Sequence, residues 1–135
     1  LHSDQLKLLE IDARLPSQTP MAVFHSTGYN MVQALACLVL EKSPPPFKTK
    51  DNPAHTLIEH IQVKDGQMEI LGEGIMSQDG PLHLETSFFG AHEALTSFSE
   101  GKNQWVATLI FTGSSIQDIM ARQTNTYNRI REAIR

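Results

Sequence analysis

Four titratable side chains are the residues of this sequence best placed to do chemistry together. His60, Glu73, His83 and Glu85 fall on one face of a predicted antiparallel sheet, because side chains alternate between the two faces of each strand. The apolar residues predicted around them are Ile58, Leu71, Ile75, Val106 and Ile110. Histidine and carboxylate groups beside apolar side chains can acquire shifted pKa values and act as general acids or bases.

Two other interpretations of this face are open. It could be a solvated face with isolated apolar residues, which is common in proteins. It could also be a partner-binding surface with an apolar centre and a polar rim. The sequence favours the partner-binding surface and identifies no catalytic residue. The residues predicted to bind the partner are Leu71, Glu73, Ile75, His83, Glu85 and Ile110.

Neither a metal nor a cofactor is predicted. The chain has six histidines, but His55, Glu59 and His60 do not have the H-E-x-x-H spacing of a zinc protease. The segment Thr112 to Ser115 joins a predicted strand to a predicted helix, yet it lacks the lysine and the glycines of a phosphate-binding P-loop. Cys37 lies in an apolar helix and is expected to be a buried, inert thiol.

Composition narrows the classes of partner and compartment. The formal net charge is −4 and the 11 lysines and arginines are scattered, which argues against nucleic acid. The longest apolar run, Ala34 to Leu40, is far shorter than the roughly 20 residues of a membrane span. A soluble, cytoplasmic protein is expected. The chain begins at Leu1 without an initiator methionine, so a trimmed start or a missing leader is expected.

The strands that must position these residues are predicted from turn chemistry. Asp65-Gly66 is a strong hairpin signal, and it places Val63 opposite Met68 and Ile61 opposite Ile70. A second hairpin turn is predicted at 79–81, which completes a three-stranded meander. A fourth strand is predicted over 105–112, after a short helix over 91–98.

Three further helices complete the expected fold. The first is predicted over 3–14, the second from about Ser26-Thr27 to Lys42, and a long C-terminal helix begins after Ser115. Apolar residues cover most of the second helix, so it is predicted to be buried at the centre. The chain is therefore expected to be a single α+β domain over 1–135, with an antiparallel sheet of about four strands. The predicted core is Leu35, Leu38, Val39, Met68, Ile70, Leu84, Phe88, Leu109 and Phe111.

These features predict a small protein-binding module, such as an adaptor, a chaperone or a complex subunit. It is expected to bind a protein partner, itself as a homo-oligomer, or both, through the outer sheet face or the C-terminal helix. The lack of a catalytic signature favours a non-enzymatic role. The alternative is a hotdog-like enzyme or small-ligand binder, in which a sheet wraps a long buried helix and acyl thioesters or similar apolar ligands bind. Only an analogy between folds suggests that alternative.

Overall fold

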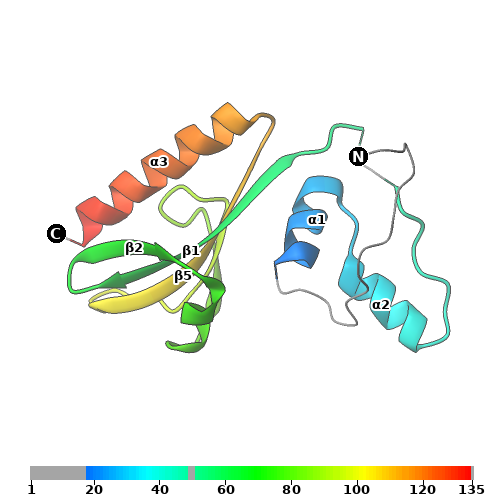
Figure 1. The fold of residues 1–135 in the computed structure, drawn as a ribbon, viewed down its shortest axis with the longest axis horizontal. Coiled ribbons are helices and arrows are strands. Elements are labelled where there is room, and N and C mark those ends of the chain that lie inside the picture. The colour runs from blue at the N-terminus through cyan, green and yellow to red at the C-terminus, as the bar shows by residue number, and fades with distance from the viewer. Residues whose placement is uncertain (1–17, 49–50, 135) are drawn as a thin grey trace, which may run out of the picture.

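The structure is a computed structural model, and it describes residues 18–48 and 51–134. It confirms an α+β fold with an antiparallel sheet, although the sheet has five strands where about four were predicted (Figure 1). The elements in chain order are α1 (Thr19–Thr27), α2 (Met31–Val39), β1 (His55–Lys64), β2 (Gln67–Leu71), the 3-10 helix η1 (Glu73–Ser77), β3 (His83–Thr86), β4 (Glu93–Thr96), β5 (Gln104–Gly113) and α3 (Ile116–Ala133).

The first hairpin has the predicted turn and register. Asp65 and Gly66 both adopt positive φ, at 51° and 74°, as a two-residue turn between twisted strands requires. Val63 pairs with Met68 and Ile61 with Ile70. The strand order in the sheet is β2-β1-β5-β4-β3, so β1 and β5 lie inside the sheet and β2 and β3 are its edges.

The second predicted hairpin is wrong. β2 ends at Leu71, η1 follows it, and β3 pairs with β4 at the opposite edge of the sheet from β2. Gly72 and Gly74 weaken an extended strand, and the helical turn lets Ile75 become buried, with 8% of its surface exposed.

The predicted helix over 91–98 is also wrong. In β4, Ala94 and Thr96 alternate as buried residues of a strand.

The main core lies between the sheet and α3. Trp105, Ala107, Leu109 and Phe111 of β5 are buried in it, and Phe88 joins them. Ile119, Tyr127 and Ile130 supply the α3 side of this core. Figure 1 shows α3 lying along one face of the sheet. The long C-terminal helix is thus confirmed, together with the core positions of Phe88, Leu109 and Phe111.

The opposite face of the sheet is covered in part by α1 and η1. Val106 and Ile110 of β5 are buried there, with 0% and 1% exposure. The Ser26 hydroxyl donates to Thr56 Oγ1 at 2.9 Å, which ties the end of α1 to β1. Helix α1 was not predicted, although Pro20 in its first turn and Gly28 at φ 81° after its last turn are ordinary helix boundary signals.

The prediction of a buried central helix is wrong. Figure 1 shows α1 between the sheet and α2, so it is α1, and not α2, that faces the sheet. Leu35, Leu38 and Val39 are 44%, 60% and 74% exposed. Among the described elements, the sheet therefore does not wrap a helix, as a hotdog-like build would require. Cys37 is half-buried where a buried thiol was expected.

Other predicted positions differ or cannot be compared. Ile70 and Leu84, which were expected in the core, are 54% and 62% exposed on the edge strands. Met68 packs against the core while staying partly buried. The helix predicted over 3–14 lies outside the described residues. Within 18–48 and 51–134, no helix has the length and apolar character needed to cross a membrane.

Candidate functional site

The six residues predicted to bind a partner do not form one surface. Leu71 ends β2, whereas His83 and Glu85 lie on β3 at the other edge of the sheet, with three strands between them. Ile75 and Ile110 are buried, so their predicted exposure is wrong. His83 and Glu85 do meet, with Nε2 and Oε1 2.9 Å apart. The predicted surface depended on pairing β2 with β3, and that pairing does not occur.

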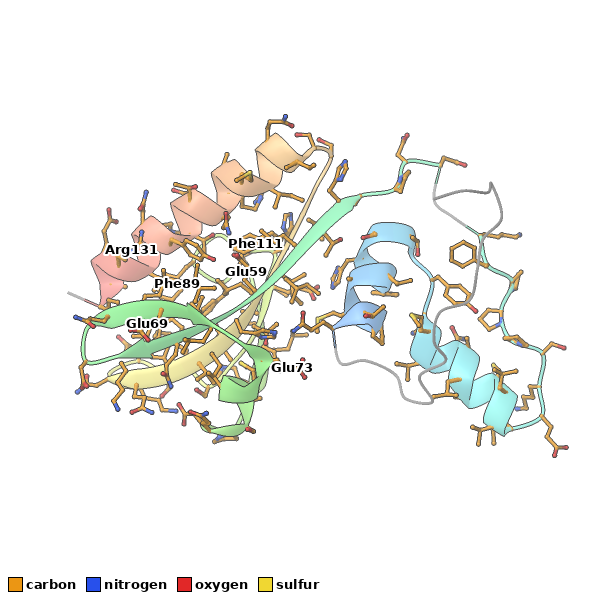
Figure 2. All side chains as sticks on the ribbon, viewed as in Figure 1. Glu59, Glu69, Glu73, Phe89, Phe111 and Arg131 are labelled. Atoms are coloured by element: carbon orange, nitrogen blue, oxygen red, sulfur yellow. The ribbon has the colours of Figure 1, made fainter. Side chains whose placement is uncertain are left out.

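His60 and Glu73 belong to a cluster between β1 and α1. His60 Nδ1 lies 2.8 Å from Thr108 Oγ1 on β5, and its Nε2 lies 2.6 Å from Gln18 Nε2. The Gln18 amide also donates to Glu73 Oε2 at 3.3 Å (Figure 2 labels Glu73 near α1). Burial lowers the pKa of His60, against the opposing charge of Glu73. Because both ring nitrogens have partners, His60 joins α1 to the sheet and is not a free base.

Glu59 lies on the other face of β1, under α3. Adjacent strand residues point to opposite faces, so Glu59 faces α3 where His60 faces α1. Its Oε2 accepts hydrogen bonds from the Tyr127 hydroxyl and from the Gln123 amide. Gln123 and Tyr127 are one helical turn apart on α3 and so share a face. Figure 2 shows Glu59 and Phe111 on the α3 side of the sheet.

Glu59 lines a groove of about 430 Å³ between β1 and α3, which we call the Glu59 groove. Its apolar walls are Leu57, Ile116, Ile119 and Met120, and the polar lining is Glu59, His55, Thr56 and Gln123. Ile116 and Met120 are 58% and 57% exposed, so the groove opens to solvent beside apolar side chains. This combination suits a ligand with an aliphatic chain and a positive charge.

The hydrogen bonds of Glu59 involve one of its two carboxylate oxygens. Burial, together with the Glu59 charge, raises the pKa of Tyr127, so its hydroxyl stays protonated and donates. Both donors meet Oε2. Within the described part of the chain, no hydrogen bond to Oε1 is present.

Two larger cavities hold titratable groups with protein partners. One, of about 660 Å³, lies beside Trp105 and Phe98 and is lined in part by Lys102, whose ammonium group binds Asp79 at 2.9 Å. The other, of about 590 Å³, lies beside the start of α3 and is lined in part by His92. His92 Nδ1 accepts from the backbone N–H of Thr112 at 3.0 Å. Over the described ranges, no three His, Cys, Asp or Glu side chains are close enough to hold a metal ion.

The sequence interpretation missed the Glu59 cluster. Glu59 was considered only with His55 and His60 as a metal ligand, and a strand separates those side chains. The available signal was the spacing of Gln123 and Tyr127 on the predicted C-terminal helix. That spacing did not identify Glu59 as the residue that Gln123 and Tyr127 face, because nothing in the sequence indicated that β1 pairs with β5 under α3.

Comparison with known proteins gives relatives of one kind. No family model matches the chain, and no solved structure matches it significantly. The chain is 29% identical over 119 residues to the 3-methyl-D-ornithine–L-lysine ligase of Methanosarcina mazei, a match that covers 87% of this chain and 31% of the ligase. Ligases of the same name from Methanosarcina acetivorans and Methanosarcina barkeri are 34% and 53% identical over 73 residues, covering 53% of this chain and 20% of each ligase. The chain thus spans less than a third of the length of the curated ligases it resembles.

Proposed function

We propose that this chain is part of a ligase that joins amino acids, and that the Glu59 groove binds the side chain of a basic amino acid. The observation that carries the proposal is the similarity to 3-methyl-D-ornithine–L-lysine ligases, which extends over 87% of the chain in the Methanosarcina mazei protein. The groove is the part of the described structure whose chemistry fits the amino acids in that name.

The fit is one of shape and charge. Ornithine and lysine side chains are aliphatic and end in a primary amine, which is protonated at neutral pH because its pKa is about 10.4. The methylene groups would pack against Leu57, Ile119 and Met120. The ammonium would donate to Glu59 Oε1, a charge-assisted hydrogen bond of the stronger kind.

Tyr127 and Gln123 support this role by holding the carboxylate in place. Their hydrogen bonds to Oε2 fix the orientation of Glu59 before a ligand arrives, which lowers the entropy cost of binding. The formal net charge of −4 also favours the approach of a cation. Glu59 binds and orients the amino acid, and no bond-forming step is assigned to it.

Binding by the chain itself tests the groove. L-lysine and D-ornithine are titrated into the 135-residue chain and followed by NMR. Glu59→Gln should weaken binding about tenfold or more, because it removes the charge that pairs with the ammonium. Glu69→Gln is the matched control, since it makes the same charge change at an exposed position of β2. Equal binding by the two variants would contradict the assignment of the groove.

A chimera tests the wider function. The matching segment of the Methanosarcina mazei ligase is replaced by this chain, and the joining of 3-methyl-D-ornithine to L-lysine is measured. The proposal expects product from the chimera and a large loss of product on Glu59→Gln. A folded chimera that binds neither amino acid and forms no product would overturn the proposal.

Protein binding, as predicted from the sequence, is the second proposal. The observation that favours it is the exposure of Leu71 on one sheet edge and of the His83–Glu85 pair on the other. Unpaired edge strands can add a strand from another molecule. Leu71→Asp should then reduce self-association in size exclusion with light scattering, and an unchanged mass distribution would count against this role.

A further inference from the structure

Helix α2 presents an exposed apolar surface that the rest of the described chain does not cover. We call it the α2 surface and define it by Val32, Leu35, Leu38 and Val39, which are 58%, 44%, 60% and 74% exposed. Val32, Leu35 and Val39 are spaced so that they lie on the same side of the helix. Leu40 and Phe47, at 64% and 62% exposure, follow close by in the sequence.

The side of α2 that carries Ala34 packs against the protein. Ala34, the one buried residue of the helix, lies away from Val32, Leu35 and Val39, while Leu38 follows it by one turn and borders the packed side, and α1 packs against α2. The Asn30 side chain accepts a hydrogen bond from the Gln33 backbone N–H at 2.9 Å and thereby caps the N-terminus of the helix. The exposed stripe therefore belongs to a regular helix with one face packed and one apolar face open.

The sheet cannot supply the missing cover. The face of the sheet under α3 is covered by α3 and the hydrophobic core between them. The other face is covered in part by α1 and η1. Among the described residues, α1 is tied to the sheet through Ser26 and Gln18, while no hydrogen bond joins α2 to a strand. An exposed apolar patch on a folded protein marks a site of contact with a protein, a ligand or a membrane.

We propose that the α2 surface docks against the remaining part of a ligase polypeptide, the part of the relatives that this chain does not match. This inference rests on the proposed function. The Methanosarcina mazei match covers 87% of this chain, so its span includes α2, because the segment left out is too short to reach α2 from either end. The same match leaves more than two thirds of that ligase unmatched. The partner surface is therefore apolar, belongs to the same polypeptide, and buries Val32, Leu35 and Val39.

Thermal melting of paired variants tests the docking. Val39→Glu and the control Gln33→Glu, which changes an exposed polar residue of the same helix, are compared in the 135-residue chain and in the Methanosarcina mazei chimera. Val39→Glu should leave the chain's melting temperature unchanged and lower that of the chimera by several degrees, because docking buries the new charge. Gln33→Glu should change neither. A chimera that melts alike with both variants would overturn the proposal.

Other occupants of the α2 surface give different results. If another part of this chain covers it, Val39→Glu lowers the melting temperature of the chain alone. If a second copy covers it, Val39→Glu converts a dimer of the chain into a monomer and leaves the chimera unchanged. Either result contradicts docking against the rest of a ligase. If the chimera melts as proposed but forms no ligated product, docking stands and the proposed function fails.

A binding measurement replaces melting if the chimera does not fold. The complementary part of the Methanosarcina mazei ligase is titrated with the chain and with each variant. Docking predicts that Val39→Glu weakens this binding about tenfold or more and that Gln33→Glu does not. Absence of binding by the unchanged chain, or equal binding by both variants, overturns the proposal.

Discussion

The apolar side chains between the sheet and α3 are buried, whereas many apolar side chains of the α1–α2 region are exposed to solvent. Leu109, Phe111 and Ile130 are 0% exposed between the sheet and α3, whereas Leu38 and Val39 of the more apolar helix α2 are 60% and 74% exposed. Apolar content alone therefore did not decide which helix is buried. The deciding factor is which faces remain open once β1 and β5 have paired and α3 has covered one face of the sheet.

The largest effect is expected from removing a core side chain of the sheet. Phe111→Ala should lower the free energy of unfolding by about 3–5 kcal/mol, because it leaves a cavity in a fully buried site. Urea unfolding of the isolated chain measures this loss. A loss below about 1 kcal/mol would mean that the core is not closed as described.

The ion pair between Asp79 and Lys102 should have a smaller, pH-dependent effect. Asp79→Asn should cost about 2 kcal/mol at neutral pH, because the carboxylate accepts hydrogen bonds from Lys102 and Ser97. The hydrogen bond from Lys102 lowers the pKa of Asp79 from its ordinary 3.8, against the effect of burial. The unfolded carboxyl group thus takes up its proton first, and this stability is lost as pH falls below about 4.

Unfolding followed as a function of acid pH checks this linkage. Asp79→Asn should unfold with a shallower pH dependence below about 4 than the unchanged chain. Lys102→Met should do the same, since it removes the cause of the lowered pKa. Parallel curves for all three proteins would contradict the role of the pair.

Tyr127→Phe should cost about 1 kcal/mol, the net value of a typical hydrogen bond, by removing the donor to Glu59. Burial raises the pKa of Tyr127 above its ordinary 10.0. The unfolded tyrosine therefore ionises first, and stability contributed by this group is lost as pH rises above about 10. Melting at alkaline pH should show this loss in the unchanged chain and less of it in Tyr127→Phe. The same decline in both proteins would contradict the burial of the hydroxyl beside Glu59.

The smallest effect is expected at the α2 surface. Leu38→Ala in the isolated chain should change the free energy of unfolding by less than about 0.5 kcal/mol, because the side chain is 60% exposed. Urea unfolding alongside Phe111→Ala gives the direct contrast. A loss at Leu38 as large as that at Phe111 would remove the distinction between the two regions.

Local sequence signals predicted local structure well. The Asp65-Gly66 turn, the strand over 105–112 and the long C-terminal helix each depend on neighbouring residues, and all three predictions are confirmed. The errors came from long-range choices. Nothing near His83 indicates that β3 pairs with β4, and nothing near Val39 indicates that other elements already cover the sheet. The Glu59 groove was missed for the same reason, since it exists only where α3 crosses β1.

Hydrogen exchange tests the contrast between the two regions most directly. It is measured for backbone amides of the 135-residue chain and of the Methanosarcina mazei chimera. The central claim is that the sheet and α3 bury their apolar side chains against each other, whereas the apolar side chains of α2 are buried only by the rest of a ligase. It predicts strong protection of β1 and β5 in both proteins, weak protection of α2 in the chain, and strong protection of α2 in the chimera. Equal protection of α2 in the two proteins would contradict it.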